Sequence, residues 1–311
     1  MEKPLVTIGL PILNGEDFID RRMESILSQT FSNFQVIISN NASNDNTRLI
    51  CEKYAKKDPR IKIFNQKETI IGEKNFAFVL EQAQTKYFVW AAVDDLWEET
   101  FLEKNFQVLE NNSKLVCCSG KVERFGDQND LKINQDDSFL KKIYKKFRMN
   151  FRPFYNLSFS GEYIEKASKC LKYNNMLFIL GLFRTEIIKK CVINYPVHSS
   201  DLIMCLKVLE FGDVKIVDEV TWKFYAKGIS SIGAWNNFKI KQLTFLEMVF
   251  PFYPLTIWCK NHFGWKFIFK NLRHFVWLNT IFGFTPLLLD IVRFRIKRKG
   301  KEFKRYKYKI N

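Results

Sequence analysis

The stretch Tyr87-Phe88-Val89-Trp90-Ala91-Ala92-Val93-Asp94-Asp95 joins an apolar run directly to two carboxylates. An uncharged run of this length, with strand formers such as Val89 and Trp90, predicts a buried strand. Its carboxyl end would lie at the edge of an α/β sheet, where such sheets bind ligands. We expect Asp94 at an exposed rim there, because carboxylates suit a hard divalent cation that can hold a diphosphate. The alternative is that Asp95 only caps a helix beginning near Glu98.

Strand and helix patterns alternate through the part of the chain that precedes this stretch. Strands are predicted at 5–10, 34–39 and 60–64, and helices at 18–27, 47–57 and 72–82. Such alternation implies right-handed crossovers and a mostly parallel sheet flanked by helices, which is an α/β fold. The polar loops 11–16 and 39–46 then share one sheet edge with Asp94 and Asp95. Three polar segments on one edge indicate a nucleotide pocket.

Five stretches, in their order and spacing, resemble the inverting glycosyltransferase family 2. They are Val6–Glu16, Ser25–Phe31, Phe34–Asp45, Tyr54–Ile61 and Trp90–Trp97. The resemblance extends over residues 4–230 and is strongest over 4–111. It implies a GT-A fold, which is a Rossmann-like α/β sheet, and transfer of a sugar from a nucleotide-sugar donor with inversion at the anomeric carbon.

The resemblance also implies roles for individual residues. Those implied in binding the donor are Pro11, Leu13, Asn14 and Glu16 in the first loop and Ser39 and Asn40 in the second. In the family the first loop lines the base and ribose pocket, and the second recognises the base. Asp94, with Asp95 beside it, matches the metal-binding carboxylate, which implies Mg²⁺ or Mn²⁺ as the cofactor.

The chain departs from the family pattern at three places. Asn40 stands where an aspartate is frequent, and because an asparagine both accepts and donates, the base of the donor is left open. Leu13 replaces a common tyrosine, which removes an aromatic platform. Ala92 and Val93 occupy the place of the first aspartate of the metal signature. Metal binding would then depend on Asp94, on Asp95 and on the diphosphate of the substrate.

Transfer with inversion also needs a base that deprotonates the acceptor hydroxyl. The apolar segment 176–184, with a helix expected to start at Arg184, resembles the acceptor side of the family, and Asp201 in the polar start of the next helix matches the catalytic base. The alternative is that Asp201 is only a cap or first-turn acid. His198 is a rival base, and Lys227 is a weak candidate for stabilising the leaving diphosphate.

Composition favours one large intracellular catalytic domain. The chain of 311 residues is 47% hydrophobic, which is sufficient for a sizeable core. Its seven cysteines have no metal-like spacing and lie mostly in apolar runs, so we expect buried, reduced thiols and a cytoplasmic protein. The first residues lead directly into a strand, so no signal peptide is expected. We predict a catalytic domain over 1–234, divided into a nucleotide-sugar half (1–111) and an acceptor half (112–234), with 126–159 unassigned.

The tail, residues 235–311, carries most of the excess positive charge. It holds 16 Lys and Arg against Glu247, Asp290 and Glu302, a net charge of +13 of the total +16, and it is dense in Trp and Phe. Its longest uncharged run, 274–289, is shorter than the roughly 20 residues that span a bilayer. Helices lying on an anionic membrane surface are therefore predicted. The alternatives are a packed cap, a nucleic-acid-binding arm, which its many bulky apolar residues disfavour, and a membrane hairpin through 244–259 and 274–290.

Together these features predict a metal-dependent glycosyltransferase that works peripherally on the cytoplasmic face of a membrane. Its acceptor would be a lipid-linked saccharide in cell-surface polysaccharide or lipopolysaccharide biosynthesis, and no nucleic-acid partner is expected. One rival function is transfer to a polyprenyl phosphate, which needs no strong base. The other is an inactive membrane-bound scaffold on the same fold, suggested by Leu13, Asn40 and Val93.

Overall fold

A computed structural model describes residues 3–125, 142, 155–225 and 244–280. It groups the chain into two compact units. The first comprises Met1–Asp127, Phe154–Pro196 and Ser200–Gly228, and the second comprises Gln128–Pro153, Val197–Ser199 and Ile229–Asn311. The candidate residue Lys227, the polybasic end of the tail and most of the unassigned stretch 126–159 lie outside the described residues.

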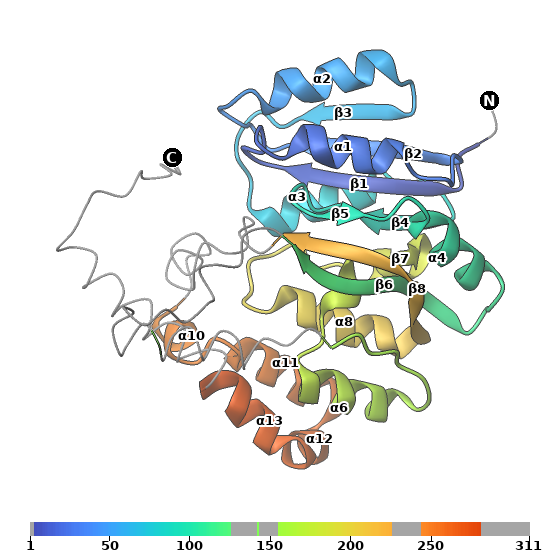
Figure 1. The fold of residues 1–311 in the computed structure, drawn as a ribbon. Coiled ribbons are helices and arrows are strands. Elements are labelled where there is room, and N and C mark those ends of the chain that lie inside the picture. Colours follow the sequence, from blue (N-terminus) through green and yellow to red (C-terminus); the bar gives the residue numbers. More distant parts are fainter. Residues whose placement is uncertain (1–2, 126–141, 143–154, 226–243, 281–311) are drawn as a thin grey trace. The chain divides into compact units, whose positions relative to one another are not determined.

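The first unit is built on one sheet in the order β3-β2-β1-β4-β7-β6-β8-β5 (Figure 1). The strands are β1 Val6–Ile12, β2 Phe34–Asn40, β3 Ile61–Asn65, β4 Tyr87–Trp90, β5 Leu96–Trp97, β6 Leu115–Phe125, β7 Leu182–Arg184 and β8 Asp213–Tyr225. Parallel pairing joins β1 to β2 and β4, β2 to β3, and β6 to β8. The short strands β5 and β7 pair antiparallel to their neighbours. The sheet is therefore mixed, and the predicted α/β class is confirmed.

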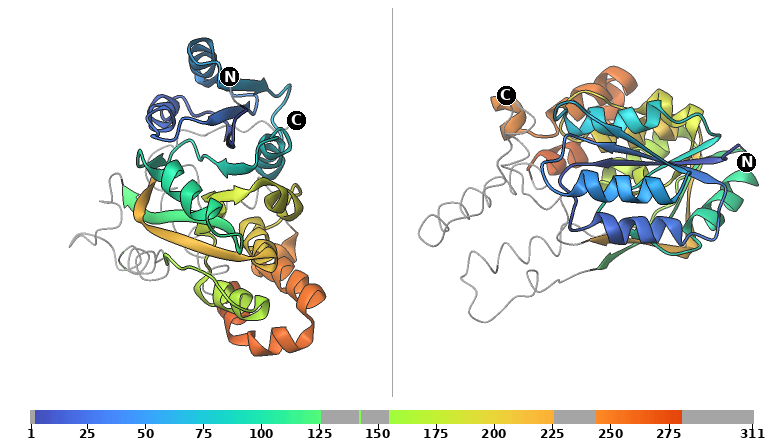
Figure 2. Two further views of the ribbon diagram at one scale, coloured as in Figure 1. Left: turned by 90° about the vertical axis from the view of Figure 1, so that its right-hand side faces the viewer. Right: turned by 90° about the horizontal axis from the view of Figure 1, so that it is seen from above.

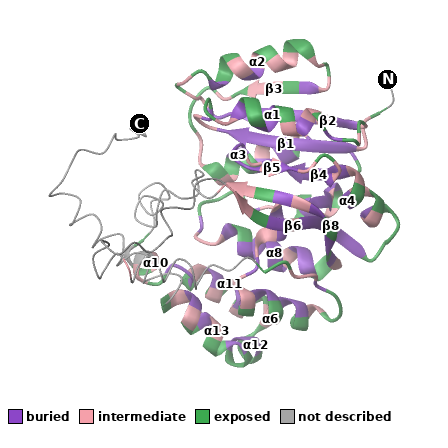
Figure 3. Ribbon diagram, viewed as in Figure 1, coloured by how far each residue is buried: buried purple, intermediate pink, exposed green. Residues whose placement is uncertain are grey.

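Helices cover both faces of this sheet (Figure 2). They are α1 Ile19–Leu27, α2 Thr47–Lys57, α3 Gly72–Glu81, α4 Phe101–Glu110, α6 Tyr163–Tyr173, α7 Thr185–Cys191 and α8 Ser200–Phe211, with a 3-10 turn at Leu177–Leu180. Apolar residues of α1 and α4 pack with the strands into one core cluster, whereas α3 contacts β1 and α7 on the other face. The central strands are buried along their length (Figure 3). The predicted α2 has the observed bounds, and α7 starts after Arg184 as expected.

The order of the first strands creates a switch point between β1 and β4. The chain moves outward from β1 through α1 and α2 to β3, and α3 then returns it to β4 on the opposite side of β1. In doubly wound sheets the crevice at the carboxyl ends of two such strands is the usual ligand site. The loops after β1, β2 and β4 all leave the sheet at this edge.

Two boundaries differ from the sequence expectations. Strand β1 continues through Pro11 to Ile12, although a stop at Pro11 was expected. The Gly9 carbonyl accepts from Ala91 N, so the backbone N–H and C=O of Gly9 point towards β4. The backbone groups of Pro11, two residues later, point the same way, but β4 has already ended at Trp90. The missing N–H of Pro11 therefore costs no ladder bond. Strand β4 stops three residues before Val93, and β5 separates Asp95 from α4, so Asp95 does not cap a helix near Glu98.

The described part of the second unit consists of short helices. These are α10 Phe245–Val249, α11 Tyr253–Phe263, α12 Trp265–Lys270 and α13 Leu272–Trp277. Thr244 and Glu247 form a capping box at the start of α10, and Gly264, with φ +80°, separates α11 from α12. In the described residues, no helix combines the length and the apolar character needed to cross a bilayer. The helical character expected for the tail is confirmed over 245–277.

All seven cysteines are free and buried, as the sequence predicts. Burial is the main cause that raises the pKa of the Cys51, Cys118 and Cys191 thiols to about 12. Thiols with so high a pKa stay protonated and are poor nucleophiles and poor metal ligands at neutral pH. The cysteines are therefore part of the core and not of a catalytic site.

Candidate functional site

Hydrogen bonds join the loops after β1 and β2 to one another. Asn14 N donates to Ser43 Oγ (2.9 Å), and Asn44 N donates back to Asn14 Oδ1 (3.0 Å). Glu16 Oε2 accepts from both the backbone and the side-chain amide of Asn46, each at 2.9 Å. The register that pairs Ile12 with Asn40 brings both loops out of the sheet side by side. The two polar loops predicted from the sequence therefore form one structure.

The segment after β4 approaches the same loops. A Cβ atom at Gly15 would lie 2.7 Å from Ile12 Cδ1 and 3.2 Å from Val93 Cγ2, so Gly15 allows a close approach of the two chain segments. The Gly15 amide donates to Thr47 Oγ1 at 2.8 Å, which ties the turn to the start of α2. The expectation that three separate segments converge on one sheet edge is thus confirmed.

Ser39 and Asn40 are buried and bonded within this loop network. The Ser39 hydroxyl donates to Asn75 Oδ1 (2.6 Å) and accepts from Gln66 Nε2 (3.1 Å). Asn40 donates through Nδ2 to Asn65 Oδ1 (2.9 Å) and accepts from Ser43 N (3.2 Å). These contacts fix the ends of β2 and β3 and the start of α3. Pro11 is also buried, whereas Leu13 and Asn14 are half-buried and Glu16 is exposed.

Asp94 and Asp95 are both covered, and they differ in their surroundings. Asp94 is 8% exposed and Asp95 2%, so the expectation of an exposed Asp94 was wrong. Asp95 accepts from Trp222 Nε1 and from Tyr225 N, both at 3.0 Å, which binds the turn after β4 to strand β8. Each carboxylate oxygen of Asp95 accepts one of these hydrogen bonds, so the side chain is anchored to β8.

A buried arginine lies behind the two carboxylates. Arg22 of α1 is 0% exposed, and its Nη1 donates to the Asp95 carbonyl at 3.1 Å. Its guanidinium carbon lies 3.9 Å from the centroid of the Trp97 ring. The Nε and Nη2 atoms of Arg22 have no hydrogen-bond partner among the described residues. The Arg22 guanidinium therefore stabilises the turn after β4 through one hydrogen bond to the Asp95 carbonyl and a cation–π contact with Trp97.

Burial sets the ionisation of this cluster. Burial, followed by the charge of Asp94, raises the pKa of Asp95 to about 7, while the Tyr225 amide, Arg22 and Trp222 act in the opposite direction. Burial also lowers the pKa of Arg22 to about 10, against the attraction of Asp95 and Asp94. At neutral pH Arg22 is therefore charged, whereas Asp95 is only partly ionised. The guanidinium offsets part of the negative charge of the turn.

The side chains at this site supply only part of the ligands that a divalent cation needs. Among the described residues, no group of three or more His, Cys, Asp and Glu side chains is arranged to hold a metal ion. Both Asp95 oxygens accept hydrogen bonds from β8, so the Asp95 carboxylate is anchored to the sheet. A carboxylate oxygen suits Mg²⁺ or Mn²⁺, and Mg²⁺ commonly completes its shell with water and substrate phosphate. The chain alone would therefore bind such an ion weakly.

The candidate bases Asp201 and His198 are neighbours in sequence but belong to different compact units. Asp201 is exposed in the first turn of α8, whose following residues are almost all buried. Its position in the first turn agrees with both the base and the first-turn alternative. His198 belongs to the second unit, where its ring meets the Phe252 ring edge to face, with centroids 5.1 Å apart. Lys227 lies outside the described residues.

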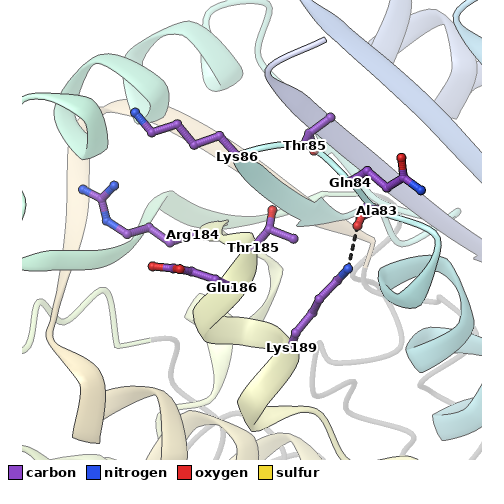
Figure 4. A pocket seen from close by; sticks show the side chains of 8 residues that line it. All are labelled: Ala83, Gln84, Thr85, Lys86, Arg184, Thr185, Glu186 and Lys189. Atoms are coloured by element: carbon purple, nitrogen blue, oxygen red, sulfur yellow. Dashed lines mark hydrogen bonds between the residues drawn. The ribbon is translucent and has the colours of Figure 1, made fainter. Parts of the chain in front are cut away.

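A shallow pocket lies at the other edge of the sheet (Figure 4). It is lined by Ala83–Lys86, which precede β4, and by residues 184–186 and Lys189 around the start of α7. Arg184 donates to the carbonyls of Leu115 and Leu109, and Lys189 donates to that of Ala83. Because Asp94 follows β4 and this pocket precedes it, the pocket is not part of the loop site.

The sequence did not predict the residues whose hydrogen bonds stabilise the loops of the site. Arg22 carried a usable signal, because it lies three residues after Ile19 and four before Ile26, on the apolar side of α1. A charged residue at such a position is buried only where it has a specific partner. Asn75, Gln66 and Trp222 carried no comparable signal, since their partners lie far away in sequence.

Comparison with known proteins identifies the family of this chain. The family model described as glycosyl transferase family 2 matches residues 7–164, half of the 311-residue chain. Over 111 residues the chain is 32% identical to the putative teichuronic acid biosynthesis glycosyltransferase TuaG of Bacillus subtilis, covering 36% of this chain and 44% of TuaG. Over 125 residues it is 41% identical to the uncharacterized glycosyltransferase EpsJ of the same organism, covering 40% of this chain and 36% of EpsJ. The chain thus spans less than half the length of these relatives.

Solved structures agree on the fold. The mannosyltransferase PcManGT from Pyrobaculum calidifontis, in complex with GDP-Man and Mn²⁺, superposes with a TM-score of 0.57 at 14% identity, over 97% of this chain and 77% of that one. TarS 1-349 of S. aureus, in complex with UDP-GlcNAc, gives a TM-score of 0.51 at 16% identity, over 76% and 64%. These likenesses show a GT-A type of fold. The match to the family model over half of the chain establishes that the chain belongs to glycosyl transferase family 2.

Proposed function

We propose that this chain transfers a sugar from a nucleotide-diphosphate sugar, with inversion, to a lipid-linked saccharide in the biosynthesis of a cell-surface polysaccharide or lipopolysaccharide. The observation that carries the proposal is the meeting of the β1 loop, the β2 loop and the Asp94 turn at the switch point between β1 and β4. The site supports binding of a nucleotide diphosphate, because it combines polar loops with a carboxylate at one sheet edge. Membership of the family supports the transfer chemistry.

The donor nucleotide would lie against the joined loops. Pro11, Leu13 and Asn14 would line the base and ribose, with Glu16 holding the second loop in place through Asn46. Ser39 and Asn40 would shape the base pocket through the network that fixes Asn65 and Asn75. Related structures carry different donors, UDP-GlcNAc in TarS and GDP-Man in PcManGT, so they leave the base of this donor open. Lys227 is proposed near the leaving diphosphate.

A divalent ion, Mg²⁺ or Mn²⁺, would be held by Asp94, with Asp95 beside it positioning the turn. The ion would neutralise charge on the leaving diphosphate. Support comes from the carboxylate chemistry of the turn and from the Mn²⁺ named with PcManGT. Because Asp95 is engaged by Trp222 and Tyr225, its contribution would be to orient Asp94 and to add negative charge behind it.

Asp201 is proposed as the base that takes the proton of the acceptor hydroxyl. Its exposure in the first turn of α8 leaves the side chain accessible to an acceptor. An anionic acceptor such as a polyprenyl phosphate would not need this base, so the effect of losing Asp201 distinguishes the two acceptor classes.

The proposed place of action is the cytoplasmic face of a membrane, with the chain bound peripherally through its tail. The net charge of +13 over residues 235–311 supports this location, because anionic lipids attract clustered Lys and Arg. A lipid-linked acceptor would be presented at such a surface. The name of TuaG, a teichuronic acid biosynthesis glycosyltransferase, agrees with a saccharide of the cell surface.

The test is hydrolysis of a panel of UDP-, GDP-, dTDP- and CDP-sugars in the presence of Mn²⁺. We expect the full chain to hydrolyse one donor class slowly, because a bound donor in a catalytic site reacts with water when no acceptor is present. The Asp94→Asn variant serves as the matched control and should lose this activity. If no donor is hydrolysed or bound, the chain is not a transferase, and the scaffold interpretation takes its place.

A further inference from the structure

Helices α12 and α13 present two different apolar surfaces. Phe267, Ile268 and Phe275 are buried at 3–4% exposure and belong to the interior. Four other large apolar side chains remain open to solvent. They are Trp265 at 60%, Phe269 at 67%, Leu272 at 49% and Val276 at 54% exposure. An amphipathic helix that packs on a protein core normally needs only one apolar stripe. A second stripe that is this exposed needs a separate explanation.

The exposed apolar side chains form one pair on each helix, and the two members of each pair lie four positions apart. Trp265 and Phe269 are four residues apart on α12, and their rings stack with centroids 5.9 Å apart at 26°. Leu272 and Val276 repeat the same spacing on α13. The Lys260 ammonium lies 5.5 Å from the centroid of the Trp265 ring. The spacing of four places each pair on one side of its helix, as a continuous surface requires.

Cations accompany these apolar residues. Lys266, Lys270 and Arg273 are all exposed, each next in sequence to an exposed apolar residue. No Asp or Glu occurs between Glu247 and Asp290. We call the four apolar side chains and these three cations the α12–α13 face. It combines bulky apolar groups with positive charge alone.

We propose that the α12–α13 face docks on an anionic lipid surface. The proposal rests on the membrane location proposed above and names the part of the chain that makes the contact. Trp and Phe side chains suit the boundary between headgroups and acyl chains, and Lys and Arg suit anionic headgroups. A polyanion such as RNA would use the cations and the aromatic rings, but it would leave Leu272 and Val276 exposed. Lipid is the occupant that satisfies all seven side chains.

The test is co-sedimentation of the full chain with vesicles of phosphatidylcholine, with or without about one third phosphatidylglycerol. One variant, Lys266→Gln/Lys270→Gln/Arg273→Gln, removes the charge of the face. A second, Trp265→Ser/Phe269→Ser, removes its aromatic pair. The matched controls lie on α2 of the first unit, where side chains of the same kind are exposed. They are Lys53→Gln/Lys56→Gln/Lys57→Gln and Leu49→Ser.

The full chain should bind anionic vesicles at low salt and bind neutral vesicles weakly. Loss of one cation should weaken binding about fivefold, and loss of all three about a hundredfold. The aromatic variant should lose about tenfold or more, because its buried ring area is gone. Both controls should bind as the unchanged chain does. Donor hydrolysis should be the same in every variant, since no substituted residue lies at the donor site.

Each other outcome overturns a defined part of the inference. If both face variants bind vesicles as tightly as the unchanged chain, the α12–α13 face is not the docking surface, although the proposed membrane location survives. A full chain that binds no anionic vesicle refutes both. Face variants that lose donor hydrolysis together with vesicle binding show that these side chains maintain the fold and do not dock. Failure of donor hydrolysis in the unchanged chain concerns the proposed function alone.

Discussion

Replacing Asp95 by asparagine tests how the turn after β4 is held. The substitution keeps the size of the side chain but removes its charge and one of its two acceptor oxygens. Trp222 Nε1 and Tyr225 N both donate to Asp95 at 3.0 Å, and one of them would lose its acceptor. Because Asp95 is only 2% exposed, leaving one of these buried donors without an acceptor should cost about 1–3 kcal/mol of folding free energy.

A second effect has the opposite sign and depends on pH. The folded-state pKa of Asp95 is raised to about 7 from an ordinary value of 3.8, mainly by burial. Between these values the folded protein retains a proton that the unfolded chain releases, so the stability contribution of Asp95 is lost as pH rises. From about pH 5 to about pH 8 this loss amounts to about 2–3 kcal/mol. Asparagine does not titrate, so the variant escapes this loss.

Asp95→Asn should therefore be less stable than the unchanged chain near pH 5, and the difference should vanish or reverse by pH 8. Urea unfolding of both proteins across this range, without divalent cations, measures it. Asp58→Asn is a suitable control, because the side-chain hydrogen bond from Arg60 lowers the pKa of Asp58, and that carboxylate stays ionised throughout the range. A stability difference for Asp95→Asn that does not change with pH would refute the reasoning. It would mean that Arg22 and the two N–H donors keep Asp95 ionised against the effect of burial.

Three further substitutions probe the site and the core. Asp94→Ala should abolish metal-dependent donor binding in calorimetric titration; unchanged donor affinity would remove Asp94 from the proposed metal site. Asp201→Asn should keep donor affinity but reduce transfer by about a hundredfold or more. If transfer survives but is lost in His198→Ala, His198 is the base, and full transfer in both variants would point to an anionic acceptor. Gly9→Ala should destabilise the fold by about 1–3 kcal/mol in urea unfolding, because its Cβ would lie 2.6 Å from the Phe88 ring and 2.8 Å from Val79 Cγ2. Wild-type stability of this variant would show that β1 and α3 can separate at little cost.

The sequence predicted those elements whose signals are local. Helix α2 has the predicted bounds because its apolar period and its flanking turn residues lie within the segment itself. The run Tyr87–Val93 also looks like one strand, but strand β4 covers only Tyr87–Trp90, and the last hydrogen bond to β1 comes from Ala91 N. Strand length there is set by pairing with β1 and β7, which the local sequence does not encode. The convergence of the loops was predictable because it follows from strand order alone.

The environment of the two carboxylates was not predictable in the same way. The residue that donates its backbone N–H to Asp95, Tyr225, lies 130 positions further along the chain, at the end of a strand that adds to the sheet through β6. Nothing in the sequence near Asp95 shows that its oxygens face the protein. Asp94 and Asp95 look equivalent in sequence, but the hydrogen bonds from Trp222 and Tyr225 make Asp95 a structural acceptor.

The charge of the turn after β4 has a consequence for how the proposed donor site would work. With Ala92 in place of a third carboxylate and the Arg22 guanidinium behind Asp94 and Asp95, the turn has too little negative charge to attract a divalent ion strongly. A nucleotide diphosphate brings negative charge and several oxygen ligands of its own. The ion and the donor should therefore bind as one unit, each weakly without the other. The same limited charge would keep repulsion between the turn and the diphosphate small, which is a physical reason for a buried arginine next to the turn proposed to bind the ion.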